Sequence, residues 1–179
     1  MAEFPLEEAL RGNNVEVEWM PFELRPYPAP TLRPEDDYLQ NAWRTSVYPL
    51  AGRMGIEIRL PTVSPQPHTR LAFEGLAFAK EHGKGNDYNS RALRGFFQQN
   101  RDIGDINVLT EIAQESGLDG AGFRLALESG QYSEQHQAAL RHVYETAGVT
   151  GVPLFVIGGR RLSGLQPRGA LEEAIISVR

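Results

Sequence analysis

The chain has 179 residues, with 18 lysines and arginines against 23 aspartates and glutamates, which gives a formal net charge of −5. It contains no cysteine, so it cannot form a disulfide, bind a metal or an iron–sulfur cluster through thiolates, or attack a substrate with sulfur. Its pI near 5.4 argues against nucleic acid as a partner, because nucleic-acid-binding domains usually carry a clustered excess of basic side chains.

The hydropathy pattern is that of a soluble globular protein. Residues Met1–Pro5 show neither the basic start nor the long apolar core of a signal peptide. No later stretch approaches the roughly 18 apolar residues of a membrane span. We therefore expect a cytoplasmic protein without a membrane partner, with either one domain that carries an insertion or two small lobes.

The first predicted elements are a short helix and a strand. Residues Pro5–Arg11 suit a helix, because Pro5 fits a first turn and the apolar residues share one side. In Val15–Met20, apolar and acidic residues alternate with the period of a half-buried strand. The next segment, Pro21–Pro34, holds too many prolines for a helix or a central strand and is expected to be a loop.

Residues 35–147 show helical periodicity broken by turn residues, which predicts a helical lobe. Asp119 and Ser133 are each expected to cap the start of a helix. One helix of this lobe has apolar residues around so much of its surface that we expect it to be buried. These residues are Ala72, Phe73, Leu76, Phe78 and Ala79.

The last part of the chain returns to strand. Leu154–Ile157 is continuously apolar, which predicts a strand covered on both faces. Gly158–Gly159 fits a two-residue hairpin turn, Arg160–Ser163 is the expected return strand, and Pro167 opens a final helix. The order of elements predicts an α/β scaffold interrupted by a helical insertion, with one lobe formed by residues 1–34 and 148–179 and the other by residues 35–147.

The segment Thr150–Pro153 stands directly before the predicted apolar strand. A proline there enters a sheet without a backbone donor, and a cis peptide bond before Pro153 is one way to accommodate it. The other is an ordinary trans proline at a strand start, which the tripeptide considered alone favours.

Four runs of sequence carry a resemblance to a known family. The chain is similar to the DsbA-like thioredoxin family, in particular to its FrnE-type branch of dithiol–disulfide oxidoreductases and isomerases. The last run resembles the C-terminal signature of the family, and the others follow in the family's order. The runs are VEVEWMPFELRP (Val15–Pro26), SPQPHTRLAFEGLAFAKEHGKGNDYN (Ser64–Asn89), RDIGDINVLTEIAQESGLD (Arg101–Asp119) and GVTGVPLFVIGGRRLSGLQP (Gly148–Pro167).

This resemblance implies a thioredoxin-like sheet with a helical insertion. In the family, a first strand leads into Cys-x-x-Cys at the start of the first helix, and the helix N-terminus lowers the pKa of the attacking thiol. By this resemblance, Thr150, Gly151, Val152 and Pro153 correspond to the cis-proline loop of the family. Their backbone groups are expected to face a bound peptide. The cysteines have no counterpart, so no catalytic residue is expected.

The run Glu3–Leu10 resembles the body of the family's first helix, which implies that the first strand and both thiols are missing before it. Met1 is then either an internal methionine of a longer reading frame or the start of a thiol-free paralogue. If a central strand is missing, the gap in the sheet can be accommodated in three ways: Val15–Met20 pairs directly with the apolar strand, a second chain fills the gap, or the fold is loosened there. We favour the second, a homodimer, because an unpaired strand edge promotes association.

Other chemistry is poorly supported by the sequence. No two of the four histidines are spaced i, i+4 on a helix, Ser46 and Ser163 lack a nucleophile elbow, and the adjacent acid pairs do not face each other. We therefore expect neither a metal nor a cofactor. A set of aromatic residues suits either a substrate groove between the lobes or ordinary core: Trp19, Trp43, Tyr48, Phe96 and Phe97.

The leading functional hypothesis is a protein thiol–disulfide oxidoreductase or isomerase by family, redox-inactive in this chain because both cysteines are absent. Its expected partner is a polypeptide substrate or a thiol protein. One alternative is the related group of 2-hydroxychromene-2-carboxylate isomerases and kappa-class glutathione transferases, in which a serine replaces the thiol, although that position is also missing here. The other is a non-catalytic module that binds peptides in the cis-proline cleft.

Overall fold

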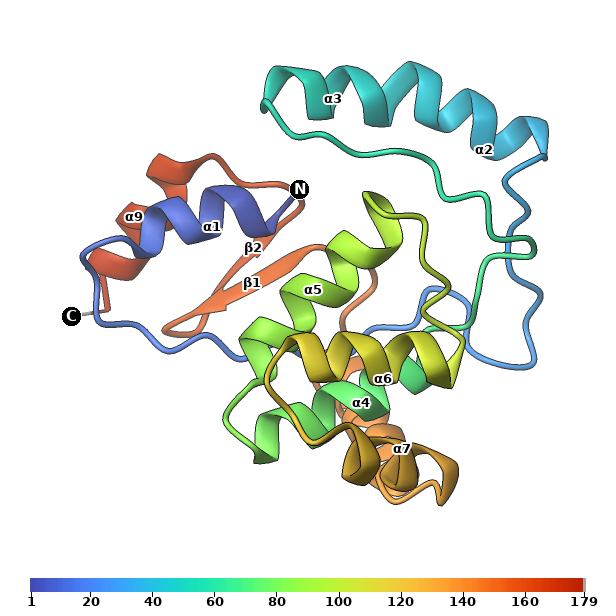
Figure 1. Cartoon of the computed structure of the whole chain (residues 1–179). Helices are drawn as coiled ribbons and strands as arrows, with labels where there is room; N and C mark the ends of the chain where they lie inside the picture. Colours follow the sequence, from blue (N-terminus) through green and yellow to red (C-terminus); the bar gives the residue numbers. More distant parts are fainter. Residues whose placement is uncertain (179) are drawn as a thin grey trace. The chain divides into compact units, whose positions relative to one another are not determined.

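The computed structural model describes residues 1–178 and divides the chain into two compact units. Unit 1 combines Met1–Glu18 with the chain from His142 onward, and unit 2 comprises Trp19–Arg141. The sequence places its lobe boundaries at residues 34/35 and 147/148 instead. Each unit is described by itself, with the elements named as in Figure 1.

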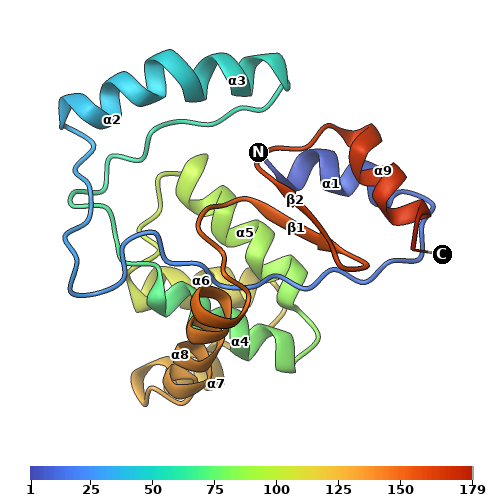
Figure 2. The same cartoon turned by 180° about the vertical axis from the view of Figure 1, so that it is seen from behind.

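Unit 1 holds two α-helices, one π-helix and the two strands found in the described residues. The helices α1 (Glu3–Leu10) and α9 (Arg168–Ile176) pack against each other, and both views show them beside the hairpin of β1 (Leu154–Ile157) and β2 (Arg160–Ser163) (Figures 1 and 2). A five-residue π-helix, η2 (His142–Thr146), precedes the strands. The buried side chains that α1 and α9 contribute are Pro5, Leu6, Ala9, Leu171, Ala174 and Ile175.

The hairpin has the predicted bounds and turn. Strands β1 and β2 are antiparallel, with Leu154 opposite Ser163 and Ile157 opposite Arg160. The turn glycines Gly158 and Gly159 have φ values of +54° and +84°, which is the backbone that a type I′ turn requires at both central positions. These local predictions are therefore confirmed.

Two strand predictions are wrong. Val15–Met20 forms no strand, and β1 pairs only with β2 among the described residues. The alternating pattern was typical of a half-buried strand, but a strand also needs a neighbour for its backbone groups. The expectation that β1 is covered on both faces also fails, because Val156 is 62% exposed.

Unit 2 is helical, as predicted. Figure 2 shows its later helices gathered together, and the contacts between α4 and each of α5, α6, α7 and α8 agree with that view. The bounds are α2 (Asp37–Ala42), π-helix η1 (Trp43–Val47), α3 (Tyr48–Arg53), α4 (Arg70–Glu81), α5 (Gly85–Phe97), α6 (Ile106–Glu115), α7 (Gly120–Glu128) and α8 (Ser133–Arg141).

The core of unit 2 is centred on α4, whose predicted burial is confirmed. Phe123 of α7 is fully buried, with its ring centroid 5.4 Å from that of Phe78 and 5.6 Å from that of Tyr88. Gly75 makes this approach possible, because a Cβ at that position would overlap the Tyr88 hydroxyl and lie 2.6 Å from Phe123 Cζ. Asp119 caps α7 as predicted, accepting hydrogen bonds from the N–H groups of Ala121 and Gly122.

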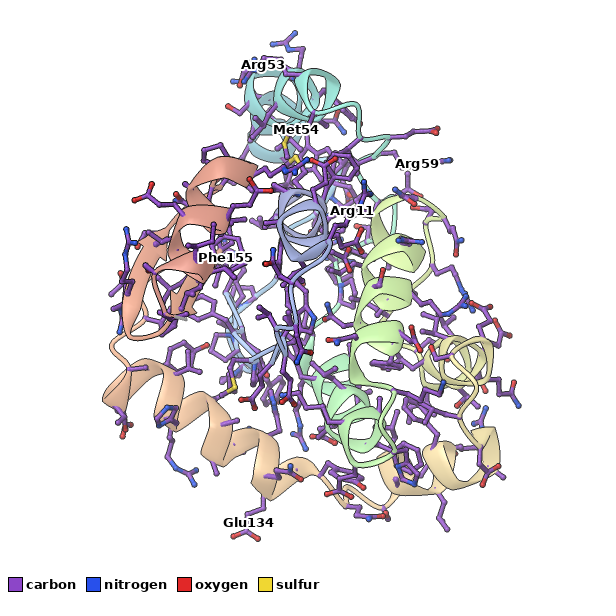
Figure 3. All side chains as sticks on the ribbon, turned by 90° about the vertical axis from the view of Figure 1, so that its left-hand side faces the viewer. Arg11, Arg53, Met54, Arg59, Glu134 and Phe155 are labelled. Atoms are coloured by element: carbon purple, nitrogen blue, oxygen red, sulfur yellow. The ribbon has the colours of Figure 1, made fainter. Side chains whose placement is uncertain are left out.

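Two polar pairs tie distant parts of unit 2 together. His136 Nε2 lies 2.5 Å from Glu23 Oε1, and both side chains are buried, whereas Glu134 on the same helix projects outward (Figure 3). The Tyr132 hydroxyl donates a hydrogen bond to Glu81 Oε2 at 2.6 Å. Burial and this carboxylate together raise the pKa of Tyr132 to about 12.

The segment that follows α3 returns along the end of α5. Figure 3 labels Arg53 and Met54 at the end of α3 and Arg59 on this segment. The Arg59 N–H donates to the Phe97 carbonyl at 2.8 Å, and the Gln98 side chain donates to the Glu57 carbonyl at 2.9 Å. One backbone and one side-chain hydrogen bond therefore hold this stretch, which forms no strand among the described residues.

Candidate functional site

A pocket lies in unit 1 where the loop after η2 enters β1. Its volume is about 240 Å³. The loop forms one wall and β2 the other. The residues that line it are Gly148, Val149, Thr150, Gly151, Val152, Pro153, Leu154, Arg161, Ser163 and Gly164. All four residues that the sequence analysis selected, Thr150–Pro153, thus meet at one cavity, and their role as a binding site is a proposal taken up below.

The start of the loop is held by the end of the preceding helix. The Ala147 N–H donates to the His142 carbonyl at 2.8 Å, and the Val149 N–H donates to the Val143 carbonyl at 3.0 Å. Gly148 between them has a φ of +57°, a left-handed conformation that commonly ends helices and that other residues adopt at a cost. The loop therefore leaves the helix at a defined point.

The end of the loop is joined to the hairpin. The peptide bond between Val152 and Pro153 is cis, as are those before Pro28 and Pro65. The Pro153 carbonyl accepts a hydrogen bond from the Gly164 N–H at 2.8 Å. This bond continues the ladder of β1 and β2 by one pair, so the loop is fixed to both strands.

Gln166 has a structural role beside the pocket. Its side-chain amide donates to the Ser163 carbonyl at 2.7 Å. That bond closes the turn after β2 and holds the strand that forms the second wall of the pocket.

The pocket offers binding groups but no strong nucleophile. Val152 is 47% exposed and presents an apolar side chain. Thr150 and Ser163 add hydroxyl groups, and no histidine lies among the lining residues to activate either of them. The arrangement suits recognition of another molecule more than a covalent step.

The described residues hold no group of three or more His, Asp or Glu side chains placed to bind a metal. His68 Nδ1 lies 3.1 Å from the Arg25 carbonyl, and His82 stacks on Phe78. His136 is occupied by Glu23. Each of these three histidines therefore has a local partner within unit 2.

Comparison with known proteins assigns the family. The profile of the DsbA-like thioredoxin domain matches residues 1–176. The chain belongs to the DsbA-like thioredoxin family. It is 51% identical over 170 residues to the protein YwbO of Bacillus subtilis (strain 168), a match that covers 94% of this chain and 85% of YwbO.

Solved structures agree with this assignment. A probable DsbA oxidoreductase from Streptomyces coelicolor aligns with a TM-score of 0.75 and 25% identity over 99% of this chain and 82% of its own. A structure from Nitrosomonas europaea, described as a "putative protein disulfide isomerase", aligns with a TM-score of 0.78 and 18% identity over 98% of this chain and 89% of its own. The second likeness concerns the fold alone.

The predicted fold class is therefore confirmed as DsbA-like, mostly helical with a small two-stranded sheet. This DsbA-like chain contains no cysteine and so lacks the Cys-x-x-Cys that the resemblance associates with the family. Among the described residues, no helix is both long and apolar enough to cross a membrane.

Four of the five aromatic residues singled out in the sequence of this DsbA-like chain form one cluster in unit 2. Trp43 contacts Tyr48 and Phe97 with ring-centroid distances of 5.4 and 6.1 Å, and Phe96 lies 4.9 Å from Phe97. Trp19 packs against the main core. Trp43 and Phe96 are buried, as ordinary core residues are, whereas Tyr48 is 44% exposed.

Sequence reasoning missed Arg161. Its guanidinium Nη1 donates to the Ala147 carbonyl at 2.7 Å, which places the charged group at the wall of the pocket beside Gly148. The alternation of side chains along β2 indicated that Arg161 and Ser163 share one face of the strand and that Arg160 lies on the other. Without the path of the loop, nothing indicated which of the two adjacent arginines faces it.

Proposed function

We propose that this chain binds an extended polypeptide at the pocket lined by Thr150–Pro153 and does not itself carry out thiol–disulfide exchange. The observation that carries the proposal is this open cavity of about 240 Å³ beside the loop, in a DsbA-like chain without cysteine. Thiol–disulfide exchange proceeds by attack of a thiolate on a disulfide sulfur, and this chain has no thiolate to offer.

The family supports a polypeptide as the ligand. The loop is the part that the resemblance assigns to contact with bound peptide, and Val152 exposes an apolar side chain there. The N–H groups of Thr150 and Gly151 have no acceptor among the described residues, so they are available to an extended backbone. Our further assignment of the chain to the FrnE-type branch rests on the resemblance of its four sequence runs.

Peptide binding is tested by calorimetric titration with an acetylated and amidated heptapeptide of serine, threonine and valine that has glutamine at its centre. We expect saturable binding to the wild type. Val152→Asp should weaken it at least about tenfold, because a charged group replaces the apolar contact at the loop. Leu125→Asp, at a 67% exposed position of α7, is the matched control and should bind like the wild type.

The same preparation separates the other functions. Insulin reduction or dithiol oxidation above the buffer control would contradict the proposed lack of redox activity. Binding of glutathione without binding of the heptapeptide would favour the isomerase and glutathione-transferase alternative instead. Absence of binding by the heptapeptide to the wild type would remove the peptide-binding proposal.

We also propose that a second copy of the chain pairs with the outer edge of β1. The hydrogen bond from Gly164 to Pro153 sets the ladder so that residues 153, 155 and 157 face β2. The backbone groups of Leu154 and Val156 then face the outer edge, where they have no partner among the described residues. An unpaired apolar strand edge favours association with another strand.

A further inference from the structure

Among the described residues, Arg161 is the one charged side chain that lines the pocket. Its only hydrogen-bond partner among the described residues is the Ala147 carbonyl, at 2.7 Å from Nη1. A guanidinium group has five N–H donors, so most of them remain available. One end of the guanidinium is therefore held by the Ala147 carbonyl, while its other N–H donors and its charge are available to a ligand.

Carboxylates lie within ion-pair distance of five of the arginines in the described part of the chain, namely Arg33, Arg70, Arg101, Arg124 and Arg168. Arg161 has no carboxylate partner in the part of the chain that the structure describes. Other arginines, Arg160 among them, also have no ion pair among the described residues, so what distinguishes Arg161 is its place at the pocket wall in a protein whose formal charge is −5.

The strand geometry separates Arg161 from its neighbour Arg160. Successive side chains of a strand point to opposite faces. Arg161 therefore shares the face of Ser163, and both line the pocket. Arg160 extends the other way, where its Nη1 lies 3.4 Å from the Ser177 hydroxyl after α9.

Backbone donors lie in the facing wall. The N–H groups of Thr150, Gly151 and Val152 have no acceptor among the described residues, and all three residues line the pocket. A guanidinium and backbone N–H groups without an acceptor, all from residues that line one pocket, supply the kind of donors that a planar, bidentate anion binds.

We propose that this pocket binds a carboxylate group of an extended polypeptide, with the guanidinium of Arg161 as its counter-ion. The inference rests on the proposed peptide-binding function and adds the chemical class that the pocket selects. The carboxylate comes from an aspartate or glutamate side chain or from the C-terminus of the ligand. Both sources present the same two oxygens to Arg161.

The test compares three heptapeptides of the same serine, threonine and valine framework. The first has a central glutamine and an amidated end, the second a central glutamate and an amidated end, and the third a central glutamine and a free C-terminal carboxylate. Dissociation constants are measured by calorimetry at low salt for the wild type and for Arg161→Gln, Arg161→Lys and Arg160→Gln. Arg160→Gln removes the same charge from the opposite face of β2 and is the matched control.

We expect at least one carboxylate peptide to bind the wild type and Arg160→Gln about five to ten times more tightly than the neutral peptide, as an Arg–carboxylate pair at an accessible site allows. Whichever peptide shows the gain identifies the source of the carboxylate. Arg161→Gln should abolish the gain, and Arg161→Lys should restore part of it. The net negative charge of the chain would by itself weaken binding of the acidic peptides, so non-specific attraction cannot produce this result.

Equal binding of all three peptides to the wild type would overturn the inference and leave peptide binding in place. A gain that survives in Arg161→Gln but disappears in Arg160→Gln would also overturn it. Failure of every peptide to bind would instead remove the proposed function itself. Because the first comparison uses only the wild type, its outcome does not depend on whether a variant folds.

Discussion

The two units differ in how their backbone groups are hydrogen-bonded and in how their cores are built. Unit 2 is built of helices, whose backbone hydrogen bonds are internal, and its core joins side chains from α4, α5, α6 and α7. Unit 1 holds a two-stranded sheet, and the outer edge of β1 has no partner among the described residues. The pocket belongs to unit 1. The proposed binding pocket therefore lies in the unit that depends on a small sheet, and the helical core lies in the other unit.

The largest effect is expected from the core of unit 2. Phe123→Ala should lower the free energy of unfolding by about 3–5 kcal/mol, because it removes a fully buried ring and leaves a cavity beside Gly75. Urea unfolding followed by circular dichroism measures the loss. The nearby exposed Leu125→Ala should change it by no more than about 0.5 kcal/mol. A loss for Phe123→Ala of less than about 1 kcal/mol would contradict the view that this core holds the helices together.

A smaller effect is expected in the hairpin of unit 1. Gly158→Ala should cost about 2–3 kcal/mol, because a left-handed backbone is strained for alanine and its Cβ would overlap the Val178 side chain. Gly159→Ala has the same type of backbone strain without that overlap and should cost about 1 kcal/mol. Equal losses of stability in the two variants, measured by thermal unfolding, would show that the Val178 side chain moves aside without cost.

The pH dependence should distinguish the units further. Burial and Glu81 raise the pKa of Tyr132 from 10.0 to about 12, so the folded state holds this proton more tightly than the unfolded state. Its contribution to stability is complete below pH 10 and is lost as the pH rises toward 12. Tyr132→Phe should cost about 1 kcal/mol at neutral pH through the lost hydrogen bond and flatten the alkaline fall in stability. Identical alkaline slopes in both proteins would refute this assignment.

The smallest change in stability should accompany Val156→Lys, at the exposed outer edge of β1. The substitution should alter the free energy of unfolding by no more than about 0.5 kcal/mol, while a lysine on a sheet edge opposes pairing with another strand. Sedimentation equilibrium at micromolar concentration should find a dimer for the wild type and for Leu125→Lys, and a monomer for Val156→Lys. A monomeric wild type would contradict the proposed dimer.

Local patterns in the sequence predicted the elements that depend on local physics. The adjacent glycines at 158 and 159 required a tight turn, and the apolar positions around α4 required burial. The strand expected at Val15–Met20 failed for a non-local reason, since its pattern says nothing about whether a neighbouring strand exists. The exposure of Val156 has the same origin, because cover on a strand face is supplied by other parts of the chain.

The candidate site was predictable only in part. Thr150–Pro153 entered through the resemblance and the unusual place of Pro153, and the structure brings all four residues to one cavity. Arg161 could not be identified, because its position at the pocket depends on the path of residues 147–149 and on the bond to the Ala147 carbonyl. A charged residue in a short exposed strand is ordinary until the structure shows what it faces.

The hydrogen bond from the Gly164 N–H to the Pro153 carbonyl provides a way to measure ligand binding at the pocket. This amide proton exchanges with solvent only when the loop parts from β2, so its exchange rate measures how often this hydrogen bond breaks. A ligand that binds only while the bond is intact would slow that rate in proportion to its occupancy. A single resonance of the amide spectrum could thus follow binding at a site that contains no chromophore, metal or thiol among its lining residues.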